Sequence, residues 1–226
     1  MRATMEAFEQ NGYAIVPRLI QVREAAVAAR ALERVHLRSA GTRNLLRLPW
    51  CRALVQRINT RLTNSNTLSS SFVAVQCTLF DKNPERNWLV ALHQDLSIPV
   101  KARVAHASLG AWSKKEDEHF VRAPAEILEK LFAVRIHIDD CGSDNGPLRV
   151  VPGSHLHGRI GDSGARDLRN ALGEAQCLAA SGDAVLIRPL ILHASSKATT
   201  PSRRRVLHIL CGPPSLPYGL AWKYAV

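Results

Sequence analysis

Short runs of β-branched and aliphatic residues, separated by clusters of turn-forming residues, fill the sequence from about residue 71 onward. The runs are Ser71–Phe80, Trp88–Val100, Leu131–Asp139, Leu148–Val151, Ala184–Leu192 and Arg205–Cys211. Pro, Gly, Asn, Asp and Ser gather in the breaks and end each run. Because most breaks are too short for the helix of a parallel crossover, the strands should pair antiparallel. This pattern predicts a mainly β fold with flanking helices, built on a double-stranded β-helix core of the jelly-roll, cupin-like class.

The sequence pattern in the first third of the chain predicts helices, which follow one short strand expected at Tyr13–Val16. From Gln21 to Leu37, apolar residues recur at helical spacing, and a second helix is expected over Trp50–Leu62. Each helix would pack an apolar face on a sheet. We therefore expect a single domain over residues 1–226, with helical N-terminal support at 1–66 and the β core at 67–226.

Two polar insertions interrupt the β core, near 101–130 and 158–174. The first is expected to contain a short helix at Pro124–Lys130, and the second to be helical or irregular. Insertions of this length in a compact domain usually cover or shape a binding site.

The composition of the chain limits its expected cellular location and its expected classes of binding partner. The chain is 46% hydrophobic and 22% charged, no stretch approaches the ~18 apolar residues of a membrane helix, and the first residues lack the apolar region of a secretory signal. We therefore expect a cytoplasmic protein without membrane association, with its 5 cysteines reduced. The net charge of +11 is spread over separate patches, and aromatic residues make up only 5%, so nucleic acid is not an expected partner. The oligomeric state is not specified.

The tripeptide His93-Gln94-Asp95 follows a strand-like run. Residues i and i+2 of a strand share a face, so this imidazole and this carboxylate can reach one ion. With 9 His and 19 acidic residues in 226, roughly one His-x-Asp pair is expected by chance. A second imidazole from His193, at the end of a distant apolar run, would complete a 2-His-1-carboxylate triad with open positions on Fe(II). The pair His137 and Asp139, together with His193, is an alternative centre.

Three consecutive arginines, Arg203, Arg204 and Arg205, open the last apolar run. Strand alternation points either Arg204 or its two neighbours inward, but not both sets. A buried guanidinium beside the metal would grip a carboxylate through two parallel hydrogen bonds, as the distal carboxylate of 2-oxoglutarate requires. His208 shares the face of Arg204 and is expected either to line the pocket or to pack.

These motifs, in this order, resemble the phytanoyl-CoA dioxygenase family of Fe(II)/2-oxoglutarate oxygenases. The resemblance runs from roughly Leu79 to Pro213 and includes His93-Gln94-Asp95, the segment Asn145–His155, and His193-Ala194-Ser195 with Arg204. It implies that His93, Asp95 and His193 bind iron. It also implies that Arg204 and Ser195 bind the distal carboxylate of 2-oxoglutarate, and that Gln76 lines the pocket. Relatives often have Gly where Ala194 stands. The turn Pro152–His155 is expected to be structural, with His155 as a hydrogen-bonding anchor.

The resemblance implies an enzyme that uses Fe(II), 2-oxoglutarate and dioxygen and releases succinate and carbon dioxide. Hydroxylation is favoured because Asp95 is present, whereas halogenases of the family carry a small residue there. Trp112, Arg135 and His137 are candidates for the substrate side of the pocket. If they face inward, the small-molecule substrate is polar or anionic, and if they face outward, they are solvated. The competing class is a cupin-like protein that binds a metal or small molecule without turnover.

Overall fold

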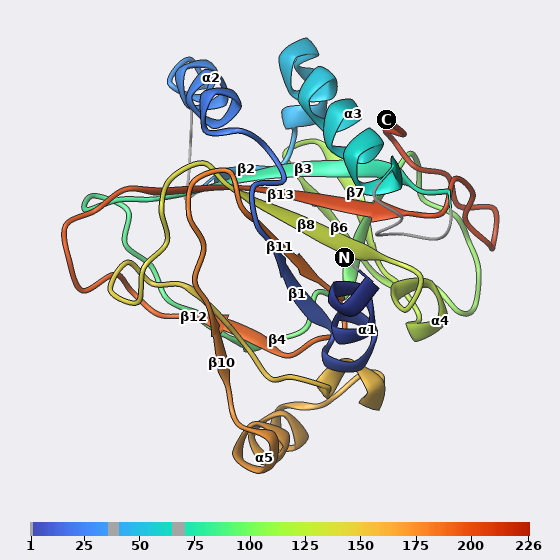
Figure 1. The fold of residues 1–226 in the computed structure, drawn as a ribbon. Coiled ribbons are helices and arrows are strands. Elements are labelled where there is room, and N and C mark those ends of the chain that lie inside the picture. The colour runs from blue at the N-terminus through green and yellow to red at the C-terminus, as the bar shows by residue number, and fades with distance from the viewer. Residues whose placement is uncertain (1, 36–40, 65–70) are drawn as a thin grey trace.

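The computed structural model describes residues 2–35, 41–64 and 71–226, whose strands form three antiparallel sheets (Figure 1). The six-stranded sheet has the order β1 (Tyr13–Val16), β11 (Ala184–Ile187), β8 (Phe132–His137), β13 (Arg204–Gly212), β3 (Val73–Lys82) and β2 (Gly41–Thr42). The four-stranded sheet has the order β10 (Ala175–Cys177), β9 (Leu148–Val150), β12 (His193–Ser195) and β4 (Val90–His93). The three-stranded sheet has the order β5 (Ser97–Val100), β7 (Glu118–Arg122) and β6 (Gly110–Lys115).

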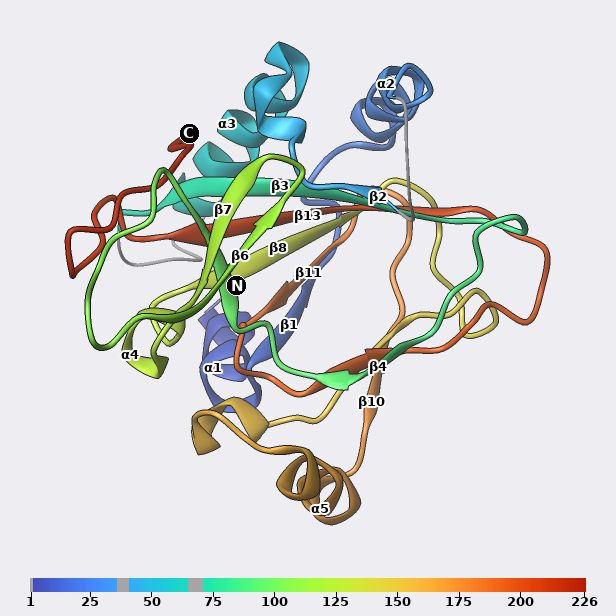
Figure 2. The ribbon, with the colours of Figure 1, turned by 180° about the vertical axis from the view of Figure 1, so that it is seen from behind.

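Helices lie outside the two larger sheets, which face one another in both views (Figures 1 and 2). The helices are α1 (Arg2–Asn11), α2 (Val22–Leu32), α3 (Pro49–Asn64), α4 (Ala125–Leu128) and α5 (Asp162–Leu172), with single 3-10 turns at Leu45–Arg47 and Ser154–His157. Helices α2 and α3 cover the outer side of the six-stranded sheet, and α5 lies on the outer side of the four-stranded sheet. This architecture confirms the predicted mainly β fold with flanking helices. Within the described residues, no helix has the length and apolar content needed to cross a membrane.

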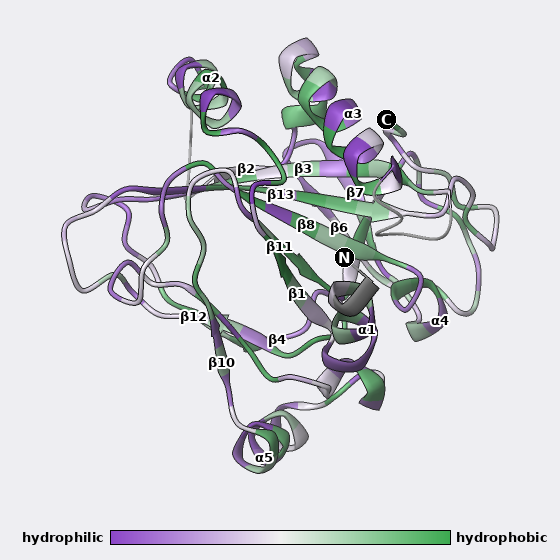
Figure 3. Cartoon of the chain, viewed as in Figure 1, coloured by the Kyte–Doolittle hydropathy of each residue, from purple (hydrophilic) through white to green (hydrophobic). Residues whose placement is uncertain are grey.

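Side-chain alternation gives the six-stranded sheet two different faces. On β8, Val134 and Ile136 pack into the core beneath α2 and α3, as Leu207 and Ile209 of β13 do. The alternate residues point to the opposite, inner side, as the period of two along a strand requires. Those inner residues include charged ones, and Figure 3 shows hydrophilic bands within the otherwise hydrophobic strands β3 and β8. The inner side of this sheet therefore combines buried apolar residues, such as Ala133, Val185 and Leu210, with charged side chains that can form a site.

Two predicted runs each divide into separate elements. Trp88–Val100 forms β4 and β5, with a break after His93. Ala184–Leu192 forms a strand only as far as Ile187, and His193 begins β12 in the other sheet. Pro189 lacks the N–H that a ladder needs, so the chain leaves one sheet there and crosses to the opposite one.

The insertion at 101–130 contains more regular structure than its polar composition indicates. Besides α4, it forms the hairpin β6–β7, which pairs with β5. Most of β6 is exposed, so it shows no apolar alternation. Helix α1, which precedes the predicted first strand, was also not expected. The expected helix over 21–37 ends at Leu32, and residues 36–37 lie outside the described residues.

Candidate metal centre

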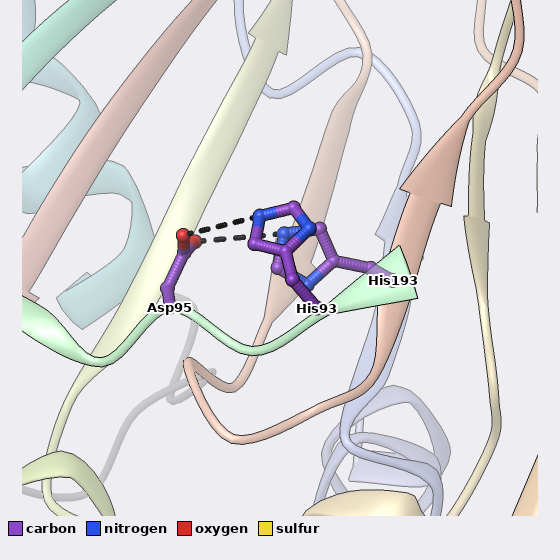
Figure 4. Close-up of side chains that lie close together, drawn as sticks. All are labelled: His93, Asp95 and His193. Carbon is purple, nitrogen blue, oxygen red and sulfur yellow. Dashed lines mark ion pairs between the residues drawn. The ribbon is translucent and has the colours of Figure 1, made fainter. Parts of the chain in front are cut away.

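Two histidines meet across a hydrogen-bonded strand pair in the four-stranded sheet. His93 ends β4, His193 begins β12, and the two residues are opposite each other in the register. Their ring centroids lie 4.2 Å apart. Asp95, just beyond β4, places one carboxylate oxygen 3.7 Å from Nε2 of His93 and the other 3.7 Å from Nε2 of His193 (Figure 4). Metal–ligand bonds of about 2.0–2.2 Å fit atoms at this separation.

The hydrogen bonds of both imidazoles leave the same ring nitrogen free for a metal. Nδ1 of His93 lies 2.8 Å from the carbonyl of Ala91, and Nδ1 of His193 lies 2.9 Å from that of Ile191. A carbonyl only accepts, so each Nδ1 carries a hydrogen, and in the neutral form of each ring Nε2 then has a lone pair facing Asp95.

The charges of the triad also suit a divalent cation. Burial lowers the pKa of His193 to about 4, so this imidazole is neutral at neutral pH. Burial acts to raise the pKa of Asp95, but the charges and hydrogen bonding of His193 and His93 outweigh it and hold that pKa below its usual value. In the described residues, His93, Asp95 and His193 are the one group of three or more His, Cys, Asp or Glu side chains with ligand atoms within 4.8 Å of one another.

Gln94 fixes the backbone between His93 and Asp95, the two members of the triad that flank it. Its side chain is buried and points away from the triad, where Nε2 donates to the carbonyls of Gly158 (2.7 Å) and Leu190 (2.6 Å). Its Oε1 accepts from the backbone N–H of Ile160 at 2.9 Å. We did not single out Gln94 from the sequence. The available signal was an uncharged polar residue on the opposite face of a His-x-Asp pair.

A cavity of about 550 Å³ opens from the triad into the space between the sheets. Its polar lining is dominated by positive charge. The cationic residues are Arg43, Lys115, Arg122, Arg135 and Arg204. Asp95 is the one acidic residue among the described residues that line it. Much of the remaining wall is apolar and includes Phe80, Ile98 and Phe120.

The three consecutive arginines separate as alternation requires, with Arg204 inward. Its Nε donates to the carbonyl of Asn145 at 3.2 Å, and its buried Nη1 has no hydrogen-bond partner. Arg203 turns outward to Asp81, and Arg205 turns outward to Asp139.

This separation also decides between the two candidate centres. Both carboxylate oxygens of Asp139 bind the Arg205 guanidinium, at 2.8 and 2.7 Å. The structure therefore does not bring Asp139 and His137 together with His193, and the alternative centre is not formed.

The other candidate residues divide between the cavity wall and its surroundings. Gln76 lines the cavity, and its buried Nε2 has no partner. Arg135 and His208 also line it, joined by a 2.9 Å hydrogen bond from Nη1 of Arg135 to Nδ1 of His208. Burial lowers the pKa of His208 to about 3 and that of Arg135 to about 10, with a further contribution in each case from a neighbouring arginine. His208 is thus neutral and Arg135 cationic at neutral pH.

Two of the expected substrate-side residues do not line the cavity. Trp112 lies on β6, where the guanidinium of Arg103 stacks over its ring. His137 is almost fully buried beside the cavity wall, and neither of its ring nitrogens has a hydrogen-bond partner.

The central motif, Asn145–His155, shapes the end of the cavity near Arg204. Ser195 lines the cavity there, and its hydroxyl donates to the carbonyl of Gly146 at 3.0 Å. Gly146 has φ of +70°, and a Cβ at this position would lie 2.4 Å from the carbonyl oxygen of Ser196. Only glycine fits this close approach. Farther along, Nε2 of His155 lies 3.0 Å from the carbonyl of Glu9, which agrees with a structural anchor.

The sequence profile of the phytanoyl-CoA dioxygenase (PhyH) family matches residues 8–206. No protein with a curated description matches the sequence. Several solved structures share the fold at low sequence identity. HygX from Streptomyces hygroscopicus, with nickel and 2-oxoglutarate bound, is 15% identical with a TM-score of 0.68, covering 96% of this chain and 89% of that chain. AviO1 from Streptomyces viridochromogenes Tue57 is 19% identical, with a TM-score of 0.67 and 96% of each chain covered. The epimerase SnoN in complex with Fe3+, alpha ketoglutarate and nogalamycin RO is 16% identical, with a TM-score of 0.70, covering 96% of this chain and 86% of that chain.

Proposed function

Since the chain belongs to the phytanoyl-CoA dioxygenase family, we propose that it is an Fe(II)- and 2-oxoglutarate-dependent dioxygenase that hydroxylates a polar or anionic small molecule. Dioxygen would place one oxygen atom in succinate and the other in the product, with release of carbon dioxide. The observation that carries this proposal is the convergence of His93, Asp95 and His193 beside a cavity lined by Arg204, whose buried Nη1 has no hydrogen-bond partner.

The donor set fits Fe(II). Two imidazoles and one carboxylate are the ligands of a facial triad, which would leave coordination positions for a chelating 2-oxo acid and for dioxygen. In this assignment His93, Asp95 and His193 hold the metal, and bound iron supplies the activation of dioxygen. The chain's own residues position the reactants and exclude water.

Unsatisfied donors support a carboxylate at the Arg204 end of the cavity. Buried donors are normally paired, yet Nη1 of Arg204 and Nε2 of Gln76 lack partners. A carboxylate accepts charge-assisted hydrogen bonds from a guanidinium in a fixed, planar geometry. We therefore assign Arg204, Ser195 and Gln76 to the binding of 2-oxoglutarate, with the distal carboxylate at Arg204 and Ser195.

The remaining charges favour an anionic or strongly polar substrate. Besides Arg204, four cationic residues line the cavity: Arg43, Lys115, Arg122 and Arg135. Among the described residues of the lining, the one acidic residue is Asp95. Positive potential focused in a cleft concentrates anions there. The structures of HygX with hygromycin B and of SnoN with nogalamycin RO show the same fold with small molecules bound.

Anaerobic titration with Fe(II) and 2-oxoglutarate tests the assignment before any substrate is known. We expect one Fe(II) per chain, a visible charge-transfer absorption on addition of 2-oxoglutarate, and slow formation of succinate once air is admitted. Asp95→Ala should abolish iron binding. Asp139→Asn should retain it, because the Asp139 carboxylate binds the guanidinium and the backbone N–H of Arg205. Equal iron binding by both variants would contradict the assignment.

Substrate screening then separates the possible reactions. Hydroxylation adds one oxygen atom from isotope-labelled dioxygen to the product, which mass spectrometry detects. An epimerisation, the reaction named for SnoN, leaves the mass of the product unchanged. Binding of 2-oxoglutarate without succinate formation, with every substrate of a broad anionic panel, would favour a binding protein without turnover.

A further inference from the structure

Three buried cations project from neighbouring strands of the six-stranded sheet. Lys82 of β3, Arg204 of β13 and Arg135 of β8 are 1%, 4% and 7% exposed. No ion pair joins any of them to a carboxylate among the described residues, whereas Arg203 and Arg205, on the outer side, bind Asp81 and Asp139. A buried charge without a counter-ion is costly, so such a group indicates that an anion is part of the functional state.

Lys82 lies at the same end of the cavity as Arg204. The two residues are opposite each other in the register of β3 and β13. The Lys82 ammonium lies 3.1 Å from Oγ of Ser195, 2.5 Å from the carbonyl oxygen of Ser196 and 5.3 Å from the centre of the Trp88 ring. Burial, together with the charge of Arg204, lowers the pKa of Lys82 to about 8. Two positive charges therefore share this end without an acidic partner.

The contact with Ser195 determines what the serine hydroxyl can do. An ammonium has no lone pair, so Lys82 donates and Ser195 Oγ accepts. The single hydrogen of the hydroxyl must then be directed to another acceptor, which is the carbonyl of Gly146 at 3.0 Å. A carboxylate oxygen in the cavity would compete for that hydrogen. Lys82 thus orients the Ser195 hydroxyl so that it can donate its hydrogen to a ligand, although Lys82 itself does not line the cavity.

We propose that Lys82 makes the cosubstrate site selective for 2-oxo acids with a second carboxylate. Together with Arg204 it provides the positive charge at the end of the cavity, and it orients the Ser195 hydroxyl toward the bound carboxylate. Lys82 is in this sense a positioning residue. The inference rests on the proposed function, because it concerns the binding of 2-oxoglutarate.

A comparison of two ligands tests this role directly. 2-Oxoglutarate and 2-oxobutyrate share the 2-oxo acid end that chelates iron, and 2-oxobutyrate lacks the distal carboxylate. Dissociation constants for both are measured anaerobically on the Fe(II)-loaded protein from the charge-transfer absorption. The variants are Lys82→Met, Lys82→Gln, and the matched control Lys114→Met, whose side chain is 60% exposed. Circular dichroism and iron stoichiometry verify that each variant is folded and loaded.

We expect Lys82→Met to weaken 2-oxoglutarate binding by about 10- to 100-fold, the range for loss of a charge-assisted interaction. Binding of 2-oxobutyrate should change less than about twofold, and Lys114→Met should match the parent protein for both ligands. Lys82→Gln keeps a hydrogen-bond donor without the charge and should be intermediate, and it replaces Lys82→Met if that variant does not fold. In a Ser195→Ala background the effect of Lys82→Met should shrink, since the two residues act as a unit.

Equal weakening of both ligands, or no weakening of either, would overturn the role of Lys82. These outcomes differ from failure of the proposed function, in which the parent protein itself would bind neither 2-oxo acid to iron.

Discussion

The side chain of Gln94 offers a direct test of how the metal centre is held in place. Its three hydrogen bonds, at 2.7, 2.6 and 2.9 Å, join the segment between His93 and Asp95 to the chain around Gly158–Ile160 and to Leu190. In Gln94→Ala these three backbone groups lose their partner. At about 1 kcal/mol for each net hydrogen bond, the free energy of unfolding should fall by about 3 kcal/mol. For a chain of this size that corresponds to a decrease in Tm of about 6–12 °C.

The same substitution should weaken iron binding, because the ligands flanking residue 94 lose their fixed backbone. We expect an increase of about 10-fold or more in the Fe(II) dissociation constant, as is typical when a residue supporting a metal ligand is removed. Thermal unfolding of the apoprotein and anaerobic Fe(II) titration measure the two effects. Gln56→Ala, at an exposed position of α3, is the control and should leave both unchanged. An unchanged Tm and iron affinity in Gln94→Ala would refute the reasoning.

Three further predictions follow from the cavity. Gly146→Ala should lower the free energy of unfolding by about 2 kcal/mol or more, measured by urea denaturation, because a Cβ would collide with the carbonyl of Ser196 at a φ of +70°; wild-type stability would contradict this clash. Arg204→Met should raise the 2-oxoglutarate dissociation constant by about 10-fold or more with unchanged Fe(II) binding, and parallel loss of both would instead indicate misfolding. Burial, followed by the charges of Arg135 and Arg204, lowers the pKa of His137 from 6.5 to about 3. Between these two pH values the unfolded chain binds more protons than the folded one, so the free energy of unfolding should fall as the pH decreases from 6.5 toward 3. In His137→Leu this part of the pH dependence should disappear, and a pH profile identical to that of the parent protein would contradict the prediction.

The sequence predicted those parts of the fold in which local pattern and burial agree. Strand β1 has the expected bounds, Tyr13–Val16, and α3 extends the expected helix by one residue at its start and two at its end. Strand β6 was missed because its exposed residues show no apolar alternation, and β10 was missed because three residues are too few to establish one. Pro189 marks locally where the run Ala184–Leu192 stops being a strand, but the crossing of the chain to the opposite sheet depends on contacts that a short stretch of sequence does not contain.

The orientation of the arginine run shows where local reasoning about the site ends. Alternation allowed either Arg204 or its neighbours to face inward, and acidic groups far away in the sequence decide between them. Glu33, Asp81 and Asp139 gather on the outer side, where they bind Arg203 and Arg205. Lys82 was not singled out because the sequence indicates a turn over Asp81-Lys82-Asn83-Pro84, where a lysine ordinarily lies on a solvated surface, whereas β3 extends to Lys82.

The histidines assigned to iron and the arginine assigned to the distal carboxylate belong to different sheets. His93 and His193 lie on β4 and β12 of the four-stranded sheet, whereas Arg204 lies on β13 of the six-stranded sheet. A 2-oxo acid that chelates the iron and reaches Arg204 would therefore act as a strut between the two walls of the barrel. Its arrival should slow amide hydrogen exchange in both walls at once, including strands that never touch it.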